Sequence, residues 1–103
     1  MEELFDCQKT DFSGCYKIIP KVRRDIRGKF VKTYHKGSFV KLGLETEFKE
    51  EYYSLSHKNV LRGLHFQLPP ADHEKLVYCV NGAVIDIILD LRSKSGTYGK
   101  VQL

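Results

Sequence analysis

The sequence has no long apolar run, few cysteines and no large excess of either charge sign. No apolar stretch approaches the roughly 20 residues that a membrane-spanning helix requires, which argues against an integral membrane protein. The acidic start, Met1 to Asp6, lacks the basic residues and the apolar stretch of a secretory signal peptide. We therefore expect neither membrane association nor secretion.

The three cysteines, Cys7, Cys15 and Cys79, are odd in number and contain no CxxC spacing. Together with the missing signal peptide, this count predicts reduced thiols and a cytoplasmic protein. Cys79 lies within an apolar strand pattern, so we predict that it is a small, buried hydrophobic residue.

Basic residues exceed acidic residues only slightly, with 17 against 13 and a net charge of +4. The basic residues are scattered rather than clustered with stacking aromatic side chains, so we expect no nucleic-acid partner. A small, doubly charged nucleotide ligand needs only two or three of them and remains compatible with the sequence.

The length of 103 residues predicts a single domain over residues 1–103. A domain of this size buries a modest share of its unfolded surface, so a dimer would stabilise it considerably. Turn signals separate short β-rich segments, which we expect as strands over residues 16–20, 29–34, 47–54, 60–67 and from 98 to the end. The first two of these strands flank a polar loop that we expect at residues 25–28. Ser38 is expected to cap one short helix that runs to Leu42 and is closed by Gly43.

The strongest local signal is a hairpin formed by residues 76–80 and 83–90 around Asn81-Gly82. Asn-Gly supplies the two positive φ angles that a type I′ turn requires. Alternation then predicts one core face after the turn, made by Ala83, Ile85, Ile87, Leu89 and Leu91. On the other face, Asp86 is expected either to pair with Lys75 or to be a buried structural carboxylate.

These elements predict an all-β fold, a sandwich or barrel of the jelly-roll kind. We count about seven strands, whereas such folds usually have eight or more, so the chain is expected to be incomplete at its C-terminal end.

Residues 59–67, with the sequence NVLRGLHFQ, look like the hallmark segment of the dTDP-4-dehydrorhamnose 3,5-epimerases. Other segments that resemble the family keep the expected order: residues 25–30, 54–56 and 75–77, Gly82, residues 86–92 and residues 95–99. The resemblance covers nearly the whole chain from about residue 14 onward. A lone RGxHF motif would be weak, whereas several segments in the correct order and spacing are strong.

The resemblance implies a cupin-type double-stranded β-helix, or jelly roll, that forms a homodimer and uses neither a metal nor an organic cofactor. It implies a nucleotide-sugar substrate, a dTDP-4-keto-6-deoxyhexose, on the route to dTDP-L-rhamnose. Family enzymes are longer than this chain. Their tyrosine acid and the aspartate that orients the histidine are expected beyond residue 103.

His65 occupies the position of the family's catalytic base. Inversion beside a ketone begins with removal of an α proton, for which a histidine, with its ordinary pKa near neutrality, is well suited. Lys75 matches the family's lysine, and a cation there would stabilise the negative charge that develops on the C4 oxygen. The alternative interpretations are a structural histidine in a strand and an exposed lysine at a strand start.

Arg27 and Arg62 match family positions that contact the nucleotide-sugar, and a guanidinium can donate two parallel hydrogen bonds to a diphosphate. Arg62 and His65 are three residues apart, so a regular strand would direct them to opposite faces. Either Gly63 marks a bulge, or Arg62 acts across a dimer interface. Gln67 is expected on the same face as His65.

Three residues depart from the family pattern: Lys32 replaces an acidic residue, Glu50 a glutamine and Tyr52 an asparagine. Glu50 and Tyr52 stand at substrate-binding positions of the family. Because the base and the cation are retained while these positions differ, the pattern favours a different 4-keto-6-deoxy sugar or the inversion of a single centre.

Two rival functions stay open. One is a shortened, inactive cupin that binds a nucleotide-sugar or only dimerises. The other is a metal-dependent cupin, which would need three or four convergent ligands. The local sequence His65-Phe66-Gln67 lacks the His-x-His pair of metal cupins, and His35, His57 and His73 lie in segments expected as loops.

Overall fold

The computed structural model describes residues 3–103, and their regular structure is mainly β with one short helix. Within these residues, six strands form three separate two-stranded antiparallel sheets. The pairs are β1 (Phe5–Lys9) with β2 (Tyr16–Pro20), β3 (Val22–Asp25) with β4 (Gly28–Val31), and β5 (Ile88–Leu89) with β6 (Val101–Gln102). The predicted all-β class is confirmed.

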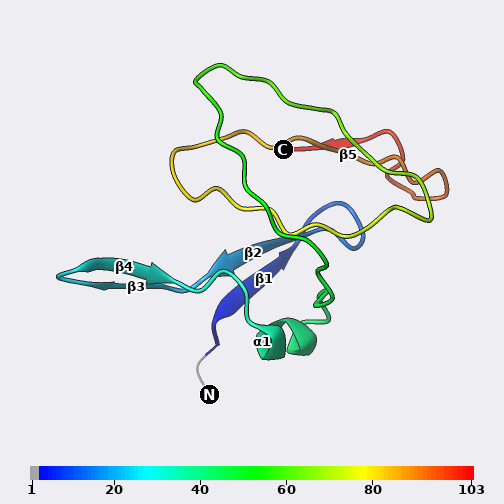
Figure 1. Cartoon of the computed structure of the whole chain (residues 1–103). Coiled ribbons are helices and arrows are strands. Elements are labelled where there is room, and N and C mark those ends of the chain that lie inside the picture. The colour runs from blue at the N-terminus through cyan, green and yellow to red at the C-terminus, as the bar shows by residue number, and fades with distance from the viewer. Residues whose placement is uncertain (1–2) are drawn as a thin grey trace.

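The β1–β2 hairpin lies in the middle of the molecule, and the β3–β4 hairpin reaches out to one side (Figure 1). The turn between β1 and β2 is held by Thr10, whose Oγ1 donates to the Cys15 carbonyl at 2.7 Å and accepts from the Phe12 N–H at 3.1 Å. Gly14 supplies the positive φ of +78° that this turn requires.

The β3–β4 hairpin has a two-residue loop, because Asp25 is paired with Gly28. Asp25 Oδ1 accepts the Arg27 N–H at 2.8 Å, which is an Asx turn, and Gly28 adopts a φ of +131°. The loop predicted at residues 25–28 is confirmed. A short side chain that caps its own turn and a glycine free of Cβ strain are sufficient to fix it.

Helix α1 (Lys36–Lys41) begins three residues before the position predicted from Ser38. His35 is the N-cap, and its Nδ1 accepts the Ser38 N–H at 3.1 Å. At the other end Gly43 has a φ of +72°, as a C-terminal glycine should. The Gly43 N–H donates to the Val40 carbonyl at 3.1 Å, and the Leu44 N–H donates to the Phe39 carbonyl at 2.9 Å. This pair of bonds is a Schellman motif.

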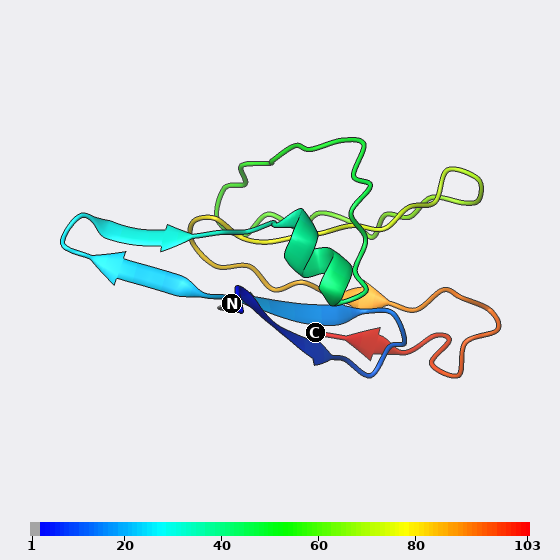
Figure 2. The same ribbon diagram turned by 90° about the horizontal axis from the view of Figure 1, so that it is seen from below.

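The hydrophobic core consists of aromatic side chains where α1 lies against β1. Phe39 is 1% exposed and packs edge-to-face on Phe5 and Tyr34, with ring centroids 5.2 and 4.8 Å apart. Tyr34 also contacts Phe48 at 5.7 Å, and Phe12 is buried beside the first turn. Figure 2 shows α1 lying over the sheet that supplies Phe5.

The predicted hairpin at residues 76–90 is wrong. Apart from Ile88 and Leu89, these residues form no strand, and these two pair with β6 instead. Gly82 has a φ of +83°, but Asn81 does not adopt the positive φ that a type I′ turn needs at its first position. The expected core face is therefore largely exposed, including Ile85 and Ile87.

Further predictions fail between residues 47 and 86, where the chain runs as wide loops (Figures 1 and 2). Residues 47–54 and 60–67 contain no strand, because their backbone groups find no partner strand. Cys79 is exposed and its thiol donates to the Asn81 carbonyl at 3.3 Å, so the prediction of a buried residue is wrong. Asp86 is exposed and is not a buried carboxylate.

Candidate functional site

His65 and Lys75, ten residues apart in sequence, line the same pocket of about 240 Å³. The other lining residues are Phe66, Gln67, Asp72 and His73. The pocket therefore joins the end of the hallmark segment to the loop that precedes Lys75. It combines two imidazoles, an ammonium, a carboxylate and one aromatic face.

Gly63 sets the direction of the chain that leads into this pocket, with a φ of +110°. A Cβ atom at residue 63 would lie 4.0 Å from His65 Nδ1, so the imidazole lies beside the glycine backbone. No strand forms over residues 60–67, so the first of the two alternatives, a strand bulge at Gly63, is wrong. A positive φ, open to glycine and strained for other residues, separates Arg62 from His65 instead.

Arg62 is held on a neighbouring part of the loop and does not line the pocket. Its Nε donates to Ser56 Oγ at 2.8 Å and its Nη2 donates to the Leu55 carbonyl at 3.2 Å. These two bonds join the hallmark segment to residues 54–56, another stretch that resembles the family. The guanidinium orientation is therefore fixed by this chain's own residues.

Arg27 lies on the loop of the projecting β3–β4 hairpin, and its side chain is 86% exposed. It donates to both carboxylate oxygens of Asp25, from Nη2 at 2.6 Å and from Nε at 3.3 Å. The side-chain and backbone hydrogen bonds from Arg27 lower the pKa of Asp25, and the Asp25 carboxylate raises the pKa of Arg27. Arg27 lies outside the pocket.

Glu50 and Tyr52 are exposed residues of the irregular segment, and neither lines the pocket. The structure thus brings together two of the six residues that the sequence singled out, His65 and Lys75. Gln67 also lines the pocket, although the strand that was expected to place it on the same face as His65 does not form. Asp72 and His73 were not selected as site residues, and their proximity in sequence to Lys75 was the signal that could have found them.

A second pocket, of about 230 Å³, lies at the base of the β3–β4 hairpin. It is lined by two apolar and three basic side chains: Leu4, Phe30, Lys21, Arg23 and Lys32. Lys32 therefore contributes to a basic surface at a position where the family pattern has an acidic residue.

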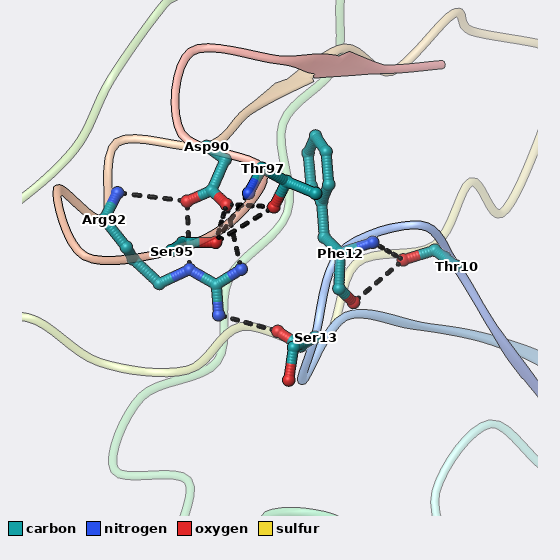
Figure 3. Close-up of polar contacts among 7 residues, drawn as sticks. All are labelled: Thr10, Phe12, Ser13, Asp90, Arg92, Ser95 and Thr97. Atoms are coloured by element: carbon teal, nitrogen blue, oxygen red, sulfur yellow. Dashed lines mark hydrogen bonds and ion pairs between the residues drawn. The ribbon is translucent and has the colours of Figure 1, made fainter.

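Asp90 is the carboxylate with the densest hydrogen bonding in residues 3–103, and its side chain is 1% exposed (Figure 3). Arg92 donates to it from Nε at 2.9 Å, from Nη2 at 3.1 Å and from its N–H at 3.0 Å. The hydroxyls of Ser95 and Thr97 donate to Oδ2 at 2.7 and 2.5 Å. The Arg92 side chain is the first cause, and the Thr97 hydroxyl the second, of a pKa of Asp90 far below its ordinary value.

The same arginine connects two distant turns, because Arg92 Nη1 donates to the Ser13 carbonyl at 2.6 Å. The Asp90 carboxylate in turn raises the pKa of Arg92. Every side-chain oxygen of Asp90 is satisfied within the chain, so this cluster has a structural role. It ties the β5–β6 turn to the β1–β2 turn.

Among residues 3–103, no three His, Cys, Asp or Glu side chains converge in a way that could hold a metal ion. The helix in this part of the chain spans six residues and is too short to cross a membrane.

In a comparison with known protein families, residues 9–103 match the family model described as dTDP-4-dehydrorhamnose 3,5-epimerase. A relative of that name from Shigella flexneri is 42% identical over 93 residues, and one from Methanothermobacter thermautotrophicus is 41% identical over 92. A dTDP-4-dehydrorhamnose 3-epimerase from Streptomyces niveus is 40% identical over 87 residues. These alignments cover 89%, 89% and 84% of this chain, and 51%, 49% and 42% of the relatives. The chain spans about half the length of the curated relatives it matches.

Proposed function

Since this chain belongs to the dTDP-4-dehydrorhamnose 3,5-epimerase family, we propose that the protein inverts C3, C5 or both in a dTDP-4-keto-6-deoxy sugar. The family has the cupin-type fold, in agreement with the fold class expected from the sequence. The reaction belongs to the formation of deoxysugars such as L-rhamnose, and it uses no metal or organic cofactor. We further propose that residues 1–103 belong to one cupin-like domain.

The observation that carries this proposal is that His65 and Lys75 line the same pocket. His65 removes the proton from the carbon beside the ketone, and the electron pair moves onto the C4 oxygen to give an enolate. Lys75 stabilises that negative charge through its ammonium group. Loss of one such donor typically costs about 10²–10³ in rate.

Recognition of the nucleotide-sugar is assigned to Arg27, Arg62, Glu50 and Tyr52. Each of these side chains is exposed, so each is accessible to a ligand or to a second subunit. We infer a homodimer, because large apolar side chains are exposed on the projecting hairpin, among them Ile26 and Phe30. We propose that Arg62 acts across this dimer interface, because it does not line the pocket of its own chain.

We also infer a cytoplasmic protein that binds neither nucleic acid nor lipid. All three cysteines are free, which is the usual state of thiols in a reducing compartment.

The departures at Glu50 and Tyr52 support a narrower proposal about the product. The relative from Streptomyces niveus is named a 3-epimerase, and the relatives from Shigella flexneri and Methanothermobacter thermautotrophicus are named 3,5-epimerases. Proteins of similar identity to this chain thus differ in the centres they invert. We propose that Glu50 and Tyr52 influence which centre reaches the base.

The test is incorporation of deuterium from solvent at C3 and C5 of dTDP-4-dehydro-6-deoxy-glucose, followed by NMR in the complete protein. We expect His65→Asn to abolish exchange and Lys75→Met to slow it by about 10²–10³. His57→Asn and Lys58→Met are matched controls, because both residues are exposed and lie outside the pocket. An active His65→Asn variant would contradict the assignment of the base. Tight binding of the nucleotide-sugar without exchange would instead favour the inactive cupin.

A further inference from the structure

The chain contains two asparagines, Asn59 and Asn81, and both are exposed. Asparagine is among the thermolabile residues, because the backbone nitrogen of the next residue can attack its side-chain amide. The attack is easiest when the next residue has no side chain, when its N–H makes no hydrogen bond and when the backbone can turn freely. The surroundings of the two asparagines differ in all three respects.

Asn81 is followed by Gly82, which places no Cβ atom beside the attacking nitrogen. The space around Gly82 is open as well, since a Cβ atom at residue 82 would meet nothing within 4 Å. No backbone carbonyl among residues 3–103 accepts a hydrogen bond from the Gly82 N–H. Hydroxide from the solvent can therefore reach this N–H and remove the proton that must leave before the nitrogen attacks.

Among the described residues, one weak bond holds the peptide group between Asn81 and Gly82. The Asn81 carbonyl accepts a hydrogen bond from Cys79 Sγ at 3.3 Å, and a thiol is a weak donor. Residues 76–87 form no strand, so no ladder of backbone hydrogen bonds fixes the torsion angles on either side of Asn81. Exposed backbone with few buried contacts is the part of a protein that opens at little cost in free energy.

Asn59 has the opposite surroundings. Its neighbour Val60 carries two methyl groups on Cβ, which crowd the backbone nitrogen. The Val60 N–H also donates to the His57 carbonyl at 3.3 Å, and this bond closes a turn around Asn59. The nitrogen that would attack Asn59 is thus both shielded and hydrogen-bonded. Asn59 is therefore an internal control for any reaction at Asn81.

We propose that Asn81-Gly82 is a site of spontaneous deamidation, a modification that does not depend on the proposed epimerase function. The Gly82 nitrogen loses its proton and bonds to Cγ of Asn81, the bond from Cγ to Nδ2 breaks, and ammonia leaves with that proton. Water then opens the resulting succinimide ring. Attack of water at Cγ gives aspartate, whereas attack at the main-chain carbonyl carbon gives isoaspartate and inserts a methylene group into the backbone. Either product adds one negative charge, so the net charge falls by one from +4 to +3.

The test follows the full chain during incubation in mildly alkaline buffer. Samples are digested, and mass spectrometry with chromatography separates the asparagine, aspartate and isoaspartate forms of each peptide. The reference is a synthetic peptide of residues 77–86 under the same conditions. We expect Asn81 in the folded chain to convert at a rate within about fivefold of that in the peptide, because a segment that opens at almost no cost reacts like an unfolded chain. Asn59 should stay intact over the same period.

Two variants assign the change in charge to one residue. Asn81→Gln keeps an amide, but its cyclisation needs a larger ring, so the acidic form of the chain should no longer accumulate on ion exchange. Asn59→Gln is the matched control and should accumulate the acidic form as the wild type does.

Conversion of Asn81 more than about fivefold slower in the folded chain than in the peptide would overturn the proposal, since the fold would then hold this backbone. Conversion of Asn59 as fast as Asn81 would overturn it as well, because the difference in surroundings would then have no effect.

Discussion

Replacement of Phe39 by alanine should remove a large part of the stability of this protein. Phe39 is 1% exposed, and its ring packs edge-to-face on both Phe5 and Tyr34. Truncation of a buried phenylalanine to alanine typically costs about 3–5 kcal/mol, through lost transfer free energy and the cavity left behind. Each aromatic pair adds about 0.5–1.5 kcal/mol beyond burial, which places Phe39→Ala in the upper part of that range.

This loss is large against the total free energy of unfolding, which is about 5–15 kcal/mol for native proteins in general. Urea denaturation followed by circular dichroism measures it as a shift of the midpoint at constant m-value. Val40→Ala is the matched control, because Val40 is the next residue of α1 and is 60% exposed. It should change stability by no more than about 0.5 kcal/mol.

Phe39→Ala has this cost only if the contact between α1 and β1 is the main hydrophobic core of the described residues. If Phe39→Ala costs less than about 1 kcal/mol, or no more than Val40→Ala, the stability lies elsewhere and the assumption is refuted.

Two further predictions concern the Asp90 cluster and the end of α1. The pKa of Asp90 is lowered on folding, so its contribution to stability is complete above the unfolded pKa of about 3.9 and is lost as the pH falls through the lower folded value. In acid denaturation, the free energy of unfolding of Asp90→Asn should therefore fall less steeply below about pH 4 than that of the wild type. Asp86→Asn, at an exposed residue, should show the same pH dependence as the wild type. Gly43→Ala should lower the free energy of unfolding, measured in urea, by about 1–2 kcal/mol, because Gly43 has a φ of +72°. A Cβ atom at residue 43 would have open space, so the cost comes from the backbone conformation alone. Gly96→Ala, with equally open space and no positive φ, should be neutral or slightly stabilising, and equal costs at both positions would contradict the argument.

The features predicted correctly from the sequence are those that a few neighbouring residues decide. The loop at residues 25–28 needs only an aspartate to cap it and a glycine with positive φ, and both are present. Gly43 ends α1 for the same reason, through hydrogen bonds within five residues. The hallmark segment and its companions also indicated the family without any knowledge of the fold, because order and spacing are properties of the chain alone.

The failed strand predictions depended on a partner segment that does not pair with them, whereas the start of α1 failed locally, because His35 and not Ser38 is its N-cap. Residues 60–67 and 76–80 have strand-like patterns, but a strand forms only when another segment satisfies its backbone groups. Cys79 was predicted to be buried because of that pattern, and its exposure follows from the absence of the hairpin. For Asp90, the sequence showed an acidic residue near an arginine and could not show that Ser95, Thr97 and the Ser13 carbonyl complete the cluster.

For the candidate site, too, the sequence predicted some features and not others. The sequence alone determined the chemistry available, since an imidazole at residue 65 and an ammonium at residue 75 are fixed by the residue types and their family positions. Only the tertiary structure decided that these groups share a pocket with His73 while Arg27 lies on a projecting hairpin. Residue type sets what a side chain can donate or accept, whereas the path of the backbone between residues 63 and 75 sets which side chains meet. That path depends on the positive φ of Gly63 and on the turn over Pro69 and Pro70, which the hydrogen bond from the Ala71 N–H to the Leu68 carbonyl closes. No periodic pattern in the sequence reveals either feature.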